Sequence, residues 1–177
     1  KNLRDVQLPK DLTFIYTSMF SGCVSLESID LTGITYIYSN AFMKTGLKSV
    51  TVPATVTTLE DAVFRECTAL ADVVFENPDT LFRYMPASSN TYSDAKYIFY
   101  GCKSLANVSL PANLTAIPQT MFQNCTSLES IELPKKLQTI GQSAFSGAGL
   151  KSMDVPEGVY SIGVNAFSNC THLERIS

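Results

Sequence analysis

The sequence predicts an α/β repeat solenoid: a right-handed coil with one parallel sheet of short strands, and with second short extended segments and short helical turns opposite. Three observations predict this fold. A phrase of 22 or 23 residues recurs, each copy alternates apolar and polar residues, and no copy could bury its own inner face. We therefore expect residues 1–177 to form a single array of about seven units, partial at both ends.

The repeat is clearest in phenylalanine, whose successive steps along the chain are 22, 22, 35, 23, 23 and 22. These residues are Phe20, Phe42, Phe64, Phe99, Phe122, Phe145 and Phe167. Leucine recurs in step, and Leu26, Leu47, Leu128 and Leu150 should lie in one buried column. Seven apolar positions match across five units, which chance does not explain.

Each unit begins with a short strand. In the unit at 26–31, Ile29 and Leu31 would share the core face, whereas Ser28 and Asp30 would face solvent. A proline follows most of these strands and ends the ladder because it lacks a backbone N–H. A second short extended segment comes next, and small residues then favour a turn of helix, as at 143–145.

Residues 76–97 interrupt one unit and produce the step of 35. Their large side chains include Leu81, Phe82, Tyr84, Met85, Tyr92 and Tyr97. One interpretation is that the insertion patches a core left incomplete, because Asp94 stands where the unit normally has isoleucine. The other is recognition: loops on rigid scaffolds often bind partners, and Tyr84 and Tyr92 are then the exposed members.

The strand phrase, LESIEL at 128–133, resembles the signature of leucine-rich repeats. The fuller phrase AFxxCxxLxx[IV]x[LV]Pxx[LV]xxI is similar to the bacterial surface-antigen subtype of that family, called BspA-like, and covers the chain outside 76–97. Here cysteine precedes the strand, so no asparagine ladder is expected. The resemblance implies a secreted or cell-surface bacterial protein with an adhesion role.

The five cysteines stand one per coil and so form a line, whereas a metal site needs ligands that converge. They are Cys23, Cys67, Cys102, Cys125 and Cys170. We expect small buried side chains under the strands; a disulfide between Cys102 and Cys125 is the alternative, although one strand spacing is at or beyond a comfortable reach. No metal or other cofactor is expected.

No residue set predicts catalysis. His172 is the only histidine and lies near the end of the chain, and the outward carboxylates have nothing around them to raise their pKa. We therefore expect no enzyme. The net charge of −3 and pI near 5.1 argue against nucleic-acid partners, and no apolar run is long enough for membrane insertion. The chain opens on Lys1 without a signal segment and is expected to be part of a longer protein, which leaves export open.

Two surfaces are candidates for binding an extracellular protein or glycan. The first is the outward column of the strand face, and the second is the tyrosine-rich insertion. The candidate residues are Asp30, Thr51, Asp72, Ser109, Glu132 and Asp154 on the face, and Tyr84 and Tyr92 in the insertion. The alternatives are that a solvated face must be polar anyway, and that the array is a structural spacer without a ligand.

The two ends of the array are expected to favour self-association. The strand beginning at Leu3 and the one containing Ile176 would be uncapped edges. End-to-end self-association is therefore a further expectation.

Overall fold

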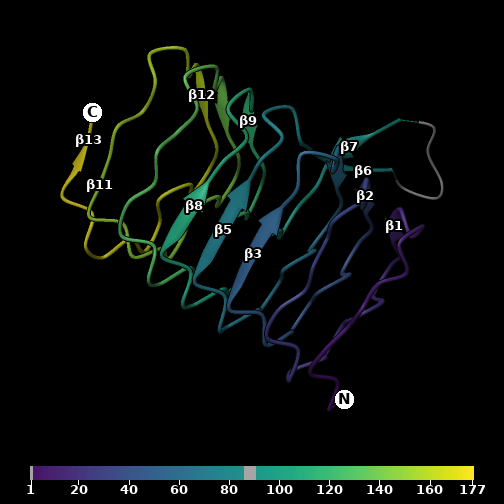
Figure 1. Cartoon of the computed structure of the whole chain (residues 1–177). Helices are drawn as coiled ribbons and strands as arrows, with labels where there is room; N and C mark the ends of the chain where they lie inside the picture. Colours follow the sequence, from purple (N-terminus) through teal and green to yellow (C-terminus); the bar gives the residue numbers. More distant parts are fainter. Residues whose placement is uncertain (1, 86–90) are drawn as a thin grey trace.

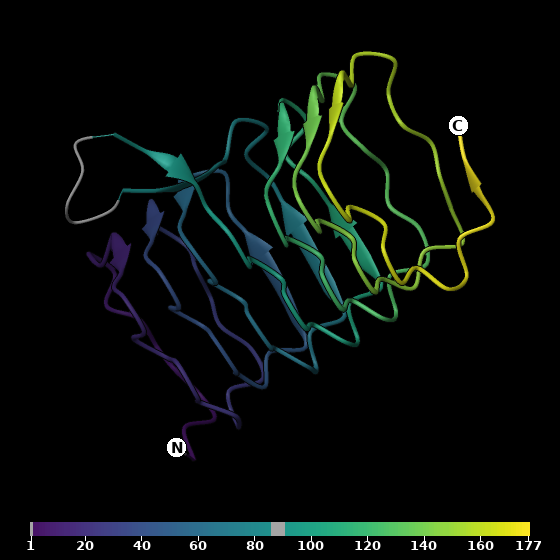
Figure 2. The same cartoon turned by 180° about the vertical axis from the view of Figure 1, so that it is seen from behind.

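The computed structural model describes residues 2–85 and 91–177, which wind as stacked coils from the N-terminus at one end to the C-terminus at the other (Figures 1 and 2). Two rows of strands run along the stack. One row contains β3 (Ser49–Val52), β5 (Asp72–Phe75), β8 (Asn107–Ser109), β11 (Ser152–Met153) and β13 (Arg175–Ile176). The other contains β1 (Phe14–Ile15), β2 (Tyr36–Ile37), β4 (Thr58–Leu59), β6 (Leu81–Tyr84), β9 (Ala116–Ile117), β10 (Thr139–Ile140) and β12 (Ser161–Ile162).

The first row is the predicted signature strand, and it pairs in parallel. β5 lies between β3 and β8, and β11 pairs with β13. Val50, Val73 and Val108 are in register across β3, β5 and β8, which lie side by side in Figure 1. Side chains alternate as expected: Val52 is buried, whereas Thr51 is exposed.

The prediction of one parallel sheet is wrong, because the second extended segments also pair. β1, β2, β4 and β6 form parallel ladders, as do β9, β10 and β12. Their register places one apolar residue of each coil over the next, as with Ile15, Ile37, Leu59 and Phe82. Backbone N–H and C=O groups that are in register in this way form hydrogen bonds with one another. Leaving such a group buried without a partner would cost free energy.

The prediction of helical turns is also wrong: no described residue lies in a helix, and hence none in a helix that could cross a membrane. In the segment at 143–145, Ser143 has a φ of 53°, and Gly147 follows at 70°. Left-handed residues at this spacing prevent a helix. Alternate N–H groups instead donate to the next coil, as Phe145 does to the carbonyl oxygen of Ala166 at 2.9 Å, and the groups between them donate three residues back.

The core is one continuous column along the stack. Leu26, Leu47, Leu128 and Leu150 are fully buried, as predicted. The repeated phenylalanines stack ring on ring, with centroids 5.3–5.6 Å apart and planes 2–11° from parallel. Each coil thus contributes a layer to a core that no coil could form alone.

The insertion is a hairpin grafted onto an intact coil. Phe82 occupies the buried repeat position in β6, so the unit continues through it and not through Asp94. β6 then pairs antiparallel with β7 (Ser93–Asp94), and the two project from the side of the stack (Figure 1). Of the residues expected to patch the core, Phe82 is buried, whereas Leu81 and Met85 are exposed. The prediction that the insertion completes the core is therefore confirmed only for Phe82.

Candidate functional site

The outward side of the first strand row, here called the sheet face, carries six of the predicted site residues. Asp30, Thr51, Ser109, Glu132 and Asp154 are exposed and occupy equivalent positions in their coils. Asp72 is also exposed but lies two residues earlier in its coil, where Val74 is in register with Thr51 and Ser109. Alternation along each short strand places them there, because the residues on either side of each one point inward. The stacking of the coils arranges the five equivalent residues as one column and places Asp72 in the column beside it, with Ser49 and Asn107.

Three adjoining hollows, of about 320, 480 and 580 Å³, lie on the sheet face between β5 and the C-terminal coils. Asp72 and Ser109 line the smallest, and Asp154 lines the hollow of about 480 Å³. Glu132 lines all three. Asp30 lines a separate hollow of about 810 Å³ near the N-terminus, whereas Thr51 lines none of these four.

The hollows coincide with a break in the sheet. Residues 128–133 carry the strand phrase, yet they form no ladder with β8 on one side or β11 on the other. The backbone N–H groups of 129–133 donate to no carbonyl group of the described residues. The row of paired strands is therefore interrupted at this coil, between β8 and β11.

The carboxylates of the sheet face differ in what they already bind. Asp30 accepts from the N–H and hydroxyl of Thr32, which lowers the pKa of Asp30. Asp72 accepts from the side chain of Asn107 at 2.7 Å. Asp154 accepts from Arg175 and Ser177. Glu132 has no such partner among the described residues, so its full acceptor capacity faces the hollows.

Tyr84 and Tyr92 lie on the β6–β7 hairpin, which grows from the other strand row. Tyr84 is half-buried, whereas Tyr92 is 55% exposed, with the Arg83 guanidinium 5.7 Å from its ring centre. The two tyrosines therefore line none of the hollows that Glu132 joins. The structure separates the two groups of candidate residues into different surfaces.

The cysteines are all free thiols, so the disulfide alternative for Cys102 and Cys125 is wrong. Four of them donate to the phenylalanine carbonyl of an earlier coil, as Cys102 does to Phe64 at 3.0 Å and Cys125 to Phe99 at 3.1 Å. Burial raises the pKa of both thiols well above its ordinary value. Within residues 2–85 and 91–177, no three metal-ligating side chains converge.

An aromatic cluster was missed from the sequence. Phe14 and Tyr16 stand on either side of Ile15, and Tyr36 and Tyr38 occupy the matching positions beside Ile37 in the next coil. Tyr16 stacks on Tyr38, with ring centroids 5.6 Å apart. Glu60 lies buried beside them and accepts from the Tyr36 hydroxyl at 2.9 Å; burial, followed by this contact, raises the pKa of Tyr36. Comparing the residues on either side of the second-row isoleucines, coil by coil, would have revealed the cluster.

Comparison with known proteins gives one family and several related folds. A family model described as BspA type leucine rich repeat region matches residues 1–93 and 95–177, in six copies. A leucine-rich repeat protein from Bacteroides ovatus is 26% identical, with a TM-score of 0.76, over 98% of this chain and 49% of that one. No curated protein matches.

Two further solved structures have the same fold. A leucine-rich repeat protein of T. pallidum is 27% identical, with a TM-score of 0.62, over 80% of this chain and 62% of that one. One from Eubacterium ventriosum is 26% identical, with a TM-score of 0.59, over 80% of this chain and 42% of that one. The chain therefore spans less than two thirds of each of these proteins.

Proposed function

We propose, from the premise that the chain belongs to the BspA type leucine-rich repeat family, that it is a non-catalytic binding module. Its partner is an extracellular protein or glycan, and its place is a secreted or cell-surface bacterial protein with an adhesion role. The family resemblance supports the location and the role. The geometry of the sheet face supports binding.

The observation that carries the proposal is the position of Glu132. This exposed carboxylate lines three adjoining hollows and has no hydrogen-bond partner among the described residues. The neighbouring backbone N–H groups of residues 129–133 donate to no backbone carbonyl of the described residues. Lysine donors and the Glu132 acceptor thus line the same hollows of a stacked scaffold, where little conformational entropy is lost on binding.

The hollows favour recognition over chemistry. Lys135 lines two of the hollows with Glu132 and Lys136 lines one of them, and the exposed residues of the sheet face are mostly small and polar. In the separate hollow near the N-terminus, hydrogen bonds from Thr32 lower the pKa of Asp30, so this carboxyl is poorly suited to act as a general acid near neutral pH. A partner with alternating donors and acceptors, such as a glycan chain or a polar protein surface, fits this arrangement.

The test is binding of the purified chain to an array of extracellular-matrix proteins and glycans. Wild type should bind at least one of them, and Glu132→Gln should weaken that binding by about tenfold, because a charge-assisted hydrogen bond is lost. Glu157→Gln is the matched control, since Glu157 is an exposed carboxylate that lines none of these hollows. No signal above a variant with a scrambled sheet face would refute the proposal.

The unbroken phenylalanine column favours a second candidate function, that of a stiff spacer without a ligand. The spacer requires only the core. Replacing Asp30, Asp72, Glu132 and Asp154 together with alanine would then leave the activity of the parent protein intact. Loss of that activity, with an unchanged melting temperature, would exclude the spacer.

A further inference from the structure

A separate hollow of about 560 Å³ lies on the turn side of the coils, and it shares no lining residue with the hollows of the sheet face. Arg65 and Lys103 are its cations, and Tyr100 contributes an aromatic ring. Thr68, Asn124 and Thr126 add neutral polar groups. The composition is that of a small polar ligand site, and the volume lies in the range of such sites.

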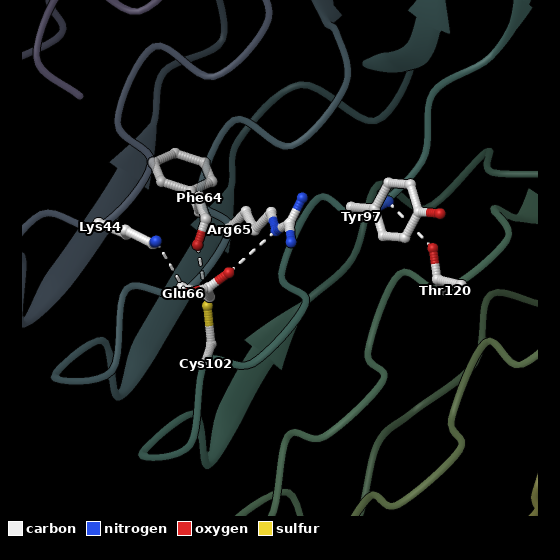
Figure 3. A network of polar contacts seen from close by, with 7 residues as sticks. All are labelled: Lys44, Phe64, Arg65, Glu66, Tyr97, Cys102 and Thr120. Atoms are coloured by element: carbon white, nitrogen blue, oxygen red, sulfur yellow. Dashed lines mark hydrogen bonds and ion pairs between the residues drawn. The ribbon is translucent and has the colours of Figure 1, made fainter. Parts of the chain in front are cut away.

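The guanidinium of Arg65 is fixed before any ligand arrives (Figure 3). Its Nε donates to Glu66 Oε1 at 3.1 Å, and its Cζ lies 5.5 and 5.2 Å from the ring centres of Tyr97 and Tyr100. The Nη groups of Arg65 have no acceptor among the described residues. The rings of Tyr97 and Tyr100 and the carboxylate of Glu66 thus orient the guanidinium, and its two Nη groups remain available to bind an anion.

The charge around this hollow is positive, in a protein whose net charge is −3. Glu66 is its only lining carboxylate, and Glu66 already pairs with Arg65 and, at 3.4 Å, with Lys44. Lys103 has no ion-pair partner among the described residues. The cations therefore exceed the carboxylate, and an anionic ligand would complete the site.

This coil departs from the repeat where the hollow lies. Tyr97 has a φ of 61°, a conformation that bulky residues rarely adopt. The other coils have small or short polar residues at that position: Ser18, Asn40, Ala62, Thr120, Ser143 and Asn165. Arg65 and Lys103 are equally exceptional, since no other unit has a cation at either position. Every coil has a left-handed residue at this position, but only here is it a bulky one, and its ring lies against the Arg65 guanidinium.

The hydrogen bonding of the turns selects the ligand class. Glu66 N–H donates to the Tyr100 carbonyl at 2.7 Å, and Gly101 N–H to that of Gln123 at 2.8 Å. A peptide main chain therefore has no free strand edge to extend here. A sugar needs only side-chain partners, and the Thr68 hydroxyl and the Asn124 carboxamide provide both donors and acceptors.

We propose that this hollow binds a carboxylate-bearing sugar unit of an acidic polysaccharide. Arg65 and Lys103 bind the carboxylate, Thr68 and Asn124 bind hydroxyl groups, and Tyr97 holds Arg65 in place. The site is independent of the sheet face, so loss of Glu132 would not affect it.

The experiment titrates the whole chain with trigalacturonate, and separately with its fully methyl-esterified form, which lacks the charge. Binding of the acid should be measurable by calorimetry and should weaken as salt is added, whereas the ester should not bind. Arg65→Ser and Lys103→Thr should each raise the dissociation constant by about tenfold or more. Both substitutions copy residues that other coils have at the same positions, so the fold should tolerate them.

Lys48→Thr is the matched control, because it removes the same charge from an exposed lysine that lines none of the five hollows. It should leave the affinity for trigalacturonate unchanged. Tyr97→Asn, which copies Asn40 and Asn165, should weaken binding without lowering the melting temperature. Equal affinity for acid and ester, no effect of Arg65→Ser, or equally tight binding of a Glu-rich hexapeptide would each overturn the proposal.

Discussion

At the scale of single residues, the thiols connect the coils. Each buried thiol donates to the carbonyl oxygen of a phenylalanine in an earlier coil, with Sγ and O 3.0 or 3.1 Å apart. The thiol thereby gives that carbonyl oxygen a hydrogen-bond partner. Leucine-rich repeats with an asparagine ladder use a side-chain amide. Here a smaller group with one weak donor is sufficient, because the partner is a single carbonyl oxygen.

The buried thiols predict an alkaline loss of stability. Burial raises the pKa of Cys125 above its ordinary value of 9.0, so the stabilisation is complete below about pH 9 and is lost as pH rises toward the folded-state pKa. Cys125→Ser keeps a donor for the Phe99 carbonyl but does not titrate. From about pH 9 to 10, wild type should lose about 1 kcal/mol more unfolding free energy than this variant, because the unfolded-state thiol ionises over that range. Parallel slopes in urea titrations would contradict this.

Two glycines mark the coils that lack cysteine and are one residue shorter. A Cβ on Gly149 would overlap the Thr126 carbonyl oxygen, and one on Gly46 would overlap that of Val24. Because these atoms belong to the backbone of the preceding coil, they cannot rotate away. The shorter units are therefore possible only with glycine at this position.

Gly149→Ala should consequently reduce the unfolding free energy by about 2 kcal/mol or more, as overpacking does. Gly158→Ala is the comparison, since its Cβ would lie 3.2 Å from the nearest atom, the Leu137 carbonyl oxygen. Chemical denaturation of both variants measures the difference. Equal losses of unfolding free energy in the two variants would show that the backbone shifts to accommodate a Cβ at Gly149.

At the scale of elements, features that depend on the repeat period, such as the buried column, were predicted from the sequence. Features that depend on contact between coils, such as the turn conformation and the strand pairing, were not. The inward column of Leu26 and its equivalents follows from spacing alone. The left-handed Ser143 does not, because Ser-Ala-Phe has no local signal against a helix and the N–H groups find their acceptors in the next coil. The gap beside residues 128–133 was equally hidden, since their phrase matches that of paired strands.

The candidate site was predictable to the same extent. Strand alternation correctly placed Asp72, Ser109 and Glu132 on one exposed face. It could not show that Glu132 joins three hollows, since that depends on how far neighbouring coils spread. The contact between Tyr97 and Arg65 could not be predicted from the repeat pattern for another reason, because it joins a turn of one coil to a turn of the next.

The hairpin should be removable as an element. Deleting residues 83–94 joins Phe82 to Ala95 and restores a step of 23 between Phe64 and Phe99. The pairing of β4 with β6 stays, as does the stacking of Phe64 on Phe99 at 5.6 Å. Thermal unfolding should remain one cooperative transition, with a loss below about 2 kcal/mol. Loss of cooperativity would show that the hairpin is part of the core.

At the scale of the whole molecule, stability is shared between neighbouring coils. The phenylalanine column continues through the coil that bears the insertion, so no layer is missing from the stack. Within this chain, the first and last coils are each packed against one other coil. Ile162 is 50% exposed, whereas its equivalent Ile140 is 1% exposed, and Met19 is 47% exposed, whereas its equivalent Met121 is fully buried.

These exposed ends predict association that depends on concentration. The two ends present different residues, so contact between them is head to tail and builds open chains rather than closed dimers. Val164 and Tyr160, 71% and 76% exposed, lie at the C-terminal end. Replacing both with glutamate should return the protein to a monomer, because charges at the contact would lose their hydration. Sedimentation equilibrium of wild type and variant measures the change.

The control is Val74→Glu, which alters an apolar residue that is 44% exposed on the sheet face rather than at an end. Its association should match that of wild type, because the stacking contact does not include Val74. A strictly monomeric wild type at high concentration would refute end-to-end contact. An equal loss of association in Val74→Glu would move the contact from the ends to the sheet face, where it would compete with the partner of Glu132.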